Sequence, residues 1–282
     1  MIDFTAWVAR LLPMPVKRAV YRFPSLAQAI RRGLNQAVPD EQTKVYIAGG
    51  GLRGLAMHLD LKSEKDYWLG TYEPELQRAV KHLVEPGMVV YDVGANIGYI
   101  SLLFARSVGE KGSVIAFEAL PSNVERLQLN LAANNFQDRV IVVSAAVIDR
   151  VGRVNFLIGP SGGMGKAEGS VGRKKLSYSR SISVPGISLD EFVYQEGNPV
   201  PQVIKMDIEG GEVLALPGMN RLLVEGRPLL LLELHGPEAA AVAWDILISR
   251  DYRIYRMKPS YPEVKGIEEL DWKSYLIAKP KA

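Results

Sequence analysis

The stretch Val89-Val90-Tyr91-Asp92-Val93-Gly94-Ala95-Asn96-Ile97-Gly98-Tyr99 decides the fold of this chain. Its first half is almost continuously apolar, as expected for a parallel strand that is covered on both faces. Gly94 removes the Cβ atom where the backbone bends, and Gly98 lets a following helix pack close to the strand or to a ligand. Because a helix N-terminus offers free N–H groups to polar or anionic ligands, the stretch predicts a nucleotide-type cofactor site.

Composition places the chain among globular α/β enzymes. It has 282 residues, of which 48% are hydrophobic, enough for the core of one large domain with or without an extension. The absence of cysteine excludes disulfides, a thiol nucleophile and cysteine-ligated metal clusters, and a cytoplasmic enzyme is the simplest setting. We expect neither a signal peptide nor a spanning helix. The net charge of +3 does not indicate nucleic-acid binding.

Charge is concentrated at the N-terminus. Residues 1–34 carry six basic side chains against Asp3 alone, and their apolar residues recur at helical spacing. Two interpretations are open: a peripheral membrane contact or partner surface, or a cap packed on the domain. With a predicted hairpin over residues 44–62, this region forms an N-terminal extension, 1–66, ahead of the main domain, 67–282.

Strands and helices alternate after the opening stretch, which implies a parallel sheet with right-handed crossovers. The predicted strands cover residues 113–118, 140–147, a segment that starts at Val203, 229–235, 252–257 and 274–278. The rhythm breaks over residues 152–189, where an inserted antiparallel pair flanks a long glycine-rich loop. Such loops often carry function, so the insertion is either a substrate-facing flap or an uninvolved surface loop.

Carboxylates stand at the ends of several predicted strands. Glu118 lies 26 positions after Asp92, near the spacing at which an acid binds a ribose diol in nucleotide-binding folds, although it could instead cap a helix. Asp207 and Glu209 precede paired glycines at the end of a buried strand. Buried carboxylates are costly unless a ligand, a metal or hydrogen-bond donors balance them. The alternative for Glu209 is that it, or Glu212, caps the next helix.

The next buried strand, 229–235, also ends in ionisable groups. Glu233 and His235 share one face if the strand is regular. Open α/β sheets bind ligands at the carboxyl ends of their strands. We therefore expect Glu233 and His235 to lie beside the acids that follow the Val203 strand.

Four motifs in order carry a resemblance to a known family. They are Tyr91-Asp92-Val93-Gly94-Ala95-Asn96-Ile97-Gly98, Phe117-Glu118-Ala119-Leu120-Pro121-Ser122-Asn123, Ser188-Leu189-Asp190 and Ile204-Lys205-Met206-Asp207-Ile208-Glu209-Gly210-Gly211-Glu212. Together they resemble the FkbM-type family of class I S-adenosylmethionine (SAM)-dependent methyltransferases, over about residues 67–256. Position 119 departs from the family, which more often has proline there.

The resemblance implies a Rossmann-like sheet of seven strands, mostly parallel with the last antiparallel, and helices on both faces. It implies that the glycine turn wraps the methionine part of SAM, that Glu118 holds the ribose hydroxyls with support from Asn123, and that Ala146 lies near the adenine. Asp207 would face the methyl-transfer centre. The implied cofactor-binding residues are Asp92, Gly94, Ala95, Asn96, Gly98, Glu118, Asn123, Ala146 and Asp207.

The function that follows is methylation of a hydroxyl on a sugar, glycan, glycolipid or related natural product. Positioning of the hydroxyl in line with the methyl group supplies most of the catalysis, and a base must take the hydroxyl proton. The candidate bases are Asp207, Glu209, Glu233 and His235, of which histidine has an ordinary pKa of about 6.5. Alternatively, Asp207 and Glu233 hold a Mg²⁺ that orients the hydroxyl, as similarly placed acids do in catechol-type O-methyltransferases.

Three other functions compete with hydroxyl methylation. A nicotinamide-dependent oxidoreductase requires Gly-x-Gly-x-x-Gly, whereas Gly94 and Gly98 give Gly-x-x-x-Gly. A non-catalytic protein of the same fold would not need the acidic strand ends. Methylation of nitrogen or carbon, on a small metabolite or a protein side chain, stays open, as do the acceptor and the oligomeric state.

Overall fold

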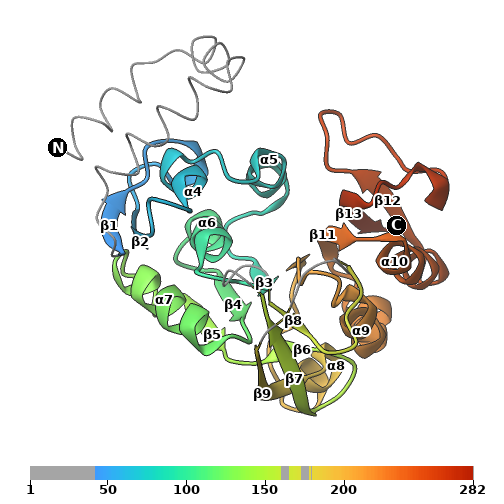
Figure 1. Ribbon diagram of the computed structural model, residues 1–282. Helices are drawn as coiled ribbons and strands as arrows, with labels where there is room; N and C mark the ends of the chain where they lie inside the picture. Colours follow the sequence, from blue (N-terminus) through green and yellow to red (C-terminus); the bar gives the residue numbers. More distant parts are fainter. Residues whose placement is uncertain (1–41, 160–164, 173–177, 179, 282) are drawn as a thin grey trace, which may run out of the picture. The chain divides into compact units, whose positions relative to one another are not determined.

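The computed structural model describes residues 42–159, 165–172, 178 and 180–281 (Figure 1). The basic segment 1–34 and its predicted helices lie outside these residues, as do parts of the inserted loop. The chain divides into two compact units, Met1–Pro74 and Glu75–Ala282. The predicted boundary after residue 66 stays a prediction. No helix within the described ranges is both long enough and apolar enough to cross a membrane.

The first unit contains the predicted hairpin. Strands β1 (Thr43–Tyr46) and β2 (Ala56–Leu59) pair antiparallel, and a short 3-10 turn, η1 (Gly50–Leu52), lies between them. Helix α4 (Lys65–Leu69) ends at Gly70, whose φ of 73° is left-handed and whose Cβ would lie 2.1 Å from the carbonyl oxygen of Gly49. Only glycine allows this close approach of helix end and hairpin.

The second unit is built on a seven-stranded sheet in the order β12-β13-β11-β10-β3-β4-β5. Its strands are β3 (Val89–Val93), β4 (Ser113–Phe117), β5 (Val140–Val143), β10 (Val203–Met206), β11 (Leu229–His235), β12 (Tyr252–Arg256) and β13 (Lys273–Pro280). β13 runs antiparallel to the other six strands of this sheet, so the predicted Rossmann-like arrangement is confirmed. The chain proceeds from β3 toward β5 and later from β10 toward β12, which makes the β3–β10 junction the topological switch point.

Helices cover this sheet. They are α5 (Pro74–Leu83), α6 (Tyr99–Val108), α7 (Pro121–Ala132), α8 (Leu189–Tyr194), α9 (Glu212–Ala215) and α10 (Pro237–Ser249). Helix α6 packs against β3 and β4, α7 against β5, and α10 against β11 and β12 (Figure 1). Within the core, the rings of Tyr91, Phe117 and Phe192 meet edge to face at centroid distances of 5.1–5.8 Å, a preferred aromatic geometry.

The insertion forms a second sheet in the order β6-β9-β7-β8. Its strands are β6 (Ala146–Val147), β7 (Gly152–Ile158), β8 (Lys166–Ala167) and β9 (Arg180–Ile187). The predicted antiparallel pair is confirmed in β7 and β9. The prediction of one strand over 140–147 was wrong, because β5 ends at Val143 and the chain turns through Ala145 into β6, which pairs with β9. An unbroken apolar run does not reveal a change of sheet partner.

Candidate functional site

The turn after β3 is built by left-handed backbone and close contacts. Gly94, Asn96 and Gly98 have φ values of 81°, 50° and 94°. A Cβ on Gly94 would lie 2.0 Å from the carbonyl oxygen of Asp207, and one on Gly98 would lie 2.5 Å from a Leu127 methyl carbon. Gly94 is therefore required where the turn touches the end of β10 at the switch point, and Gly98 is favoured by its left-handed backbone where α6 begins beside Leu127.

Glu118 joins this turn to the end of β4. The carboxylate is buried, and it accepts hydrogen bonds from the backbone N–H groups of Asn96 (2.8 Å) and Leu120 (2.8 Å) and from the Asn123 side chain (3.4 Å). Burial raises the pKa of Glu118 above its ordinary value, and the N–H donors offset part of that increase. Oε1 accepts the bonds from Leu120 and Asn123, and Oε2 accepts the bond from Asn96, so one lone pair on Oε2 is left for a hydroxyl donor.

Asp92 is completely buried and contacts Lys205 rather than an open space. Its oxygens lie 2.6 Å from the Ser101 hydroxyl and 3.3 Å from Lys205 Nζ, and Lys205 also donates to the carbonyl of Gly94 at 2.9 Å. Asp92 therefore orients the lysine that holds the glycine turn, and its direct contact with a cofactor stays a prediction. Sequence reasoning missed Lys205, although a lone lysine in an apolar strand was a signal.

The other predicted cofactor residues also lie around this turn. Ala95 is buried and donates its N–H to Phe117 at 2.9 Å, and Ala146 is buried where β6 begins. Their contacts with a cofactor stay predictions.

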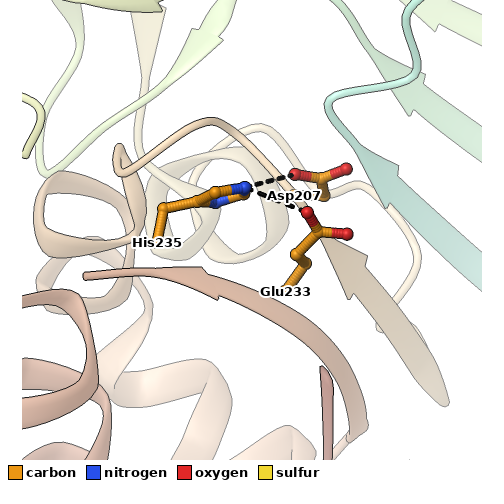
Figure 2. A group of neighbouring side chains, drawn as sticks. All are labelled: Asp207, Glu233 and His235. Carbon is orange, nitrogen blue, oxygen red and sulfur yellow. Dashed lines mark ion pairs between the residues drawn. The ribbon is translucent and has the colours of Figure 1, made fainter. Parts of the chain in front are cut away.

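The acids after β10 and the end of β11 come together, as the strand ends predicted. Nε2 of His235 lies 2.9 Å from Glu233 Oε1 and 3.9 Å from Asp207 Oδ1 (Figure 2). It also lies 3.8 Å from Glu209 Oε2. Asp207 and Glu209 side chains are each 19% exposed, whereas His235 is fully buried. An acceptor entering from solvent therefore meets Asp207 or Glu209 before His235.

His235 is held by charge on both sides of its ring. Nδ1 lies 3.8 Å from Glu212, and within the described chain neither ring nitrogen has a partner in hydrogen-bond geometry. Burial alone would lower its pKa, but contacts with Glu212 and Glu233 and the charge of Asp207 raise the pKa of His235 to about 10. Glu212 also accepts the N–H of Ile208 at 3.0 Å, but Ile208 precedes α9 and that helix has no side-chain cap, so the capping alternative was wrong for Glu212.

Two site residues come from β13 and the loop before it, and sequence reasoning missed both. Lys273 pairs with His235 across the sheet and forms an ion pair with Glu233. Burial by itself raises the pKa of Glu233, but the contacts with His235 and Lys273 outweigh burial and lower it. The indole of Trp272 meets the His235 ring edge to face at 6.2 Å between centroids. Antiparallel pairing with a strand near the chain end leaves no local pattern to read.

The described part of the insertion contacts the acidic turn. Val171 donates its N–H to the carbonyl of Gly210 at 3.0 Å, and Lys166 Nζ donates to the Val171 carbonyl at 2.9 Å. A Cβ on Gly210 would lie 2.4 Å from that same carbonyl. The segment 165–172 therefore packs on the turn that carries Glu209.

The Ser188-Leu189-Asp190 motif supports the scaffold. The Ser188 hydroxyl caps helix α8 by accepting the N–H of Glu191 and donates to the carbonyl of Gly218. The Asp190 carboxylate accepts the backbone N–H groups of Arg221 and Leu222, both at 2.8 Å. The motif thus ties α8 to the segment before β11.

Residues 92–254 match the profile of the methyltransferase FkbM domain. The chain belongs to the FkbM methyltransferase family. The hexuronic acid methyltransferase AglP of Haloferax volcanii is 29% identical over 163 residues, which are 58% of this chain and 62% of that relative. This FkbM chain therefore spans less than two thirds of the curated relative's length.

Solved structures with similar folds are more distant. The FkbM methyltransferase from Methylobacillus flagellatus KT is 21% identical, with a TM-score of 0.45, covering 68% of this chain and 43% of that one. A SAM-dependent O-methyltransferase from Thermotoga maritima is 13% identical, with a TM-score of 0.43, covering 86% and 79%. Because these scores lie below 0.5, membership of the FkbM family rests on the sequence match.

Proposed function

We propose that this protein is a SAM-dependent methyltransferase that methylates a hydroxyl group of a sugar, glycan, glycolipid or related natural product. One observation carries the proposal. At the switch point, the glycine turn after β3 contacts both the Glu118 carboxylate, through Asn96 N–H at 2.8 Å, and the backbone of Asp207. The acid that we propose binds the ribose and an acidic strand end thus flank one turn.

The residues present fit SAM. Glu118 would accept the ribose hydroxyls, and the turn Gly94–Gly98 would lie against the methionine part, with no Cβ at its two ends. Asn123 would keep Glu118 oriented, and Ala146 would lie beside the adenine. Lys205 would hold the glycine turn in place by its hydrogen bond to the Gly94 carbonyl.

When bound, SAM supplies an electrophilic methyl carbon, and a new C–O bond forms as the S–C bond breaks with its electron pair passing to sulfur. The protein must hold the acceptor hydroxyl in line and receive its proton. Asp207 and Glu209 are the two candidate bases whose side chains reach solvent. Glu233 and His235 lie behind them and would orient the acidic pair.

A sugar acceptor is supported by the relative AglP, which is named a hexuronic acid methyltransferase. Methylation of nitrogen or carbon, and a non-catalytic cofactor-binding role, are the alternatives. A cytoplasmic location stays a prediction, and so does a peripheral membrane contact through residues 1–34, which lie outside the described ranges.

The test is transfer of labelled methyl from SAM to a panel of neutral sugars, uronic acids, glycolipids and amines, with SAM affinity measured by calorimetry. Label on a sugar hydroxyl is expected. Asp207→Asn and Glu209→Gln should lower kcat more than they weaken SAM binding, whereas Glu110→Gln, an exposed acid away from the turn, serves as the matched control. Label only on amines would reject the hydroxyl assignment, and absence of SAM binding would reject the enzyme.

A further inference from the structure

The carboxyl ends of β10 and β11 bring several ionisable side chains together. Among the residues that the structure describes, they include Asp207, Glu209, Glu212, Glu233, His235 and Lys273. Carboxylate oxygens are the ligands that divalent cations such as Mg²⁺ and Mn²⁺ prefer.

His235 adds an independent observation that points to a ligand. It is fully buried, and within the described part of the chain its Nδ1 and Nε2 atoms have no hydrogen-bond partner. Its 2.9 Å approach to Glu233 is a charge contact without hydrogen-bond geometry. Buried imidazoles normally have their ring nitrogens satisfied, and Figure 2 shows Nε2 of this ring directed at the oxygens of Asp207 and Glu233.

The spacing of these atoms suits one ion. Ligand atoms of Asp207, Glu233 and His235 all lie within 4.8 Å of one another. Around an octahedral ion with bonds of about 2.1 Å, neighbouring ligands lie about 3 Å apart and opposite ligands about 4.2 Å apart. The observed separations from Nε2, 2.9 Å to Glu233 and 3.9 Å to Asp207, fall in this range.

We propose that Asp207, Glu233 and His235 bind one divalent transition-metal ion of the Mn²⁺ class. Carboxylates suit Mg²⁺ and Mn²⁺, whereas imidazole suits Mn²⁺ and later transition metals better than Mg²⁺. The nitrogen ligand thus modifies the earlier expectation of Mg²⁺ on Asp207 and Glu233 alone. The second oxygen of Glu233, Oε2, is buried without a hydrogen-bond partner in the described chain, so Glu233 has an oxygen left to bind an ion while Oε1 contacts His235 and Lys273.

Glu212 supports the same assignment from the other side of the ring. A metal-bound histidine commonly donates its remaining N–H to a carboxylate, which fixes the tautomer. Glu212 lies 3.8 Å from Nδ1 and is itself oriented by the Ile208 N–H. Three protein ligands leave positions on the ion for water or for an acceptor hydroxyl, whose proton would pass to Glu209. Only this last role rests on the proposed methyl transfer.

Titration of the whole chain with Mn²⁺, followed by the loss of the free-ion electron paramagnetic resonance signal, tests the site. We expect one bound ion, and affinity about tenfold or more weaker in Asp207→Asn, Glu233→Gln and His235→Ala. Glu110→Gln should bind Mn²⁺ like the wild type. If His235→Ala does not fold, as judged by circular dichroism, the two isosteric variants carry the test.

No binding at about 1 mM Mn²⁺, or equal affinity in the ligand variants and Glu110→Gln, would overturn the metal site. Calorimetry with SAM separates this result from the proposed function. Mn²⁺ binding without SAM binding would keep the metal site and reject the methyltransferase. SAM binding and methyl transfer without any Mn²⁺ binding would reject the metal site and keep the methyltransferase.

Discussion

At the residue scale, the pKa of Glu118 connects the burial of its carboxylate with the binding of a ligand. Burial raises its pKa, while the proposed ribose contact requires the ionised carboxylate to accept a hydroxyl donor. We therefore expect SAM affinity to fall as the pH drops through the raised pKa, by about tenfold per pH unit below it. Calorimetry between about pH 5 and about pH 8 measures this slope. Glu118→Gln should bind SAM more weakly and with a flatter pH profile.

The unliganded protein should show the opposite trend from the same group. A raised folded-state pKa gives a contribution to stability that is fully present below the ordinary glutamate value of about 4.3 and is lost as the pH rises through the raised value. Binding and stability thus depend on pH with opposite signs at Glu118. Parallel SAM-binding profiles for the wild type and Glu118→Gln would contradict this assignment.

The Asp92–Lys205 pair makes a second prediction at this scale. Both side chains are at least 95% buried, so Lys205→Met leaves an unbalanced carboxylate and should cost about 3–5 kcal/mol of unfolding free energy. The double variant Asp92→Asn/Lys205→Met removes both charges and should recover much of this loss. Urea unfolding measures both. Equal stability of the single and double variants would show that the pair is not coupled.

At the scale of elements, the turn after β3 depends on a glycine at position 94, which has no Cβ atom. Gly94→Ala would place that atom 2.0 Å from the Asp207 carbonyl and force β3 and β10 apart. Gly87 is the matched control, because its φ of 92° is also left-handed but nothing lies within 4 Å of an added Cβ. Gly87→Ala should cost about 1–2 kcal/mol from φ strain alone, and Gly94→Ala about 1–3 kcal/mol more. Thermal unfolding compares them, and similar losses would remove the close approach as the reason for Gly94.

Local sequence patterns predicted the strands and helices of this fold well where all residues of an apolar run belong to the same sheet. Strand β3 (Val89–Val93) and helix α6 (Tyr99–Val108) lie where the opening stretch predicts a strand and a following helix, because a buried strand and its glycine turn are encoded within a few residues. The segment 140–147 was mispredicted because its two halves join different sheets. The apolar residues of the run do not specify which distant strand each half pairs with.

At the scale of the molecule, parallel topology explains why the candidate site was mostly predictable. Glu118, Asp207, Glu233 and His235 end parallel strands, so they had to meet at one edge of the sheet. Lys273 reaches Glu233 by antiparallel pairing from β13, and Lys205 reaches Asp92 by lateral register between β10 and β3. The positions of these two lysines depend on strand pairing in the folded sheet, which the spacing of residues in the sequence does not specify.

The cofactor should therefore stabilise one part of the molecule. All proposed SAM contacts lie within the unit Glu75–Ala282. SAM at about 100 times its dissociation constant adds about 2.7 kcal/mol to the folded state, which corresponds to about 5–11 °C for a unit of this size. Calorimetric scanning should show this shift in the transition that includes the seven-stranded sheet, and Glu118→Gln at the same SAM concentration should show a smaller one. A shift confined to unfolding of the β1–β2 hairpin would place the cofactor in the other unit, since a ligand stabilises only the structure that binds it.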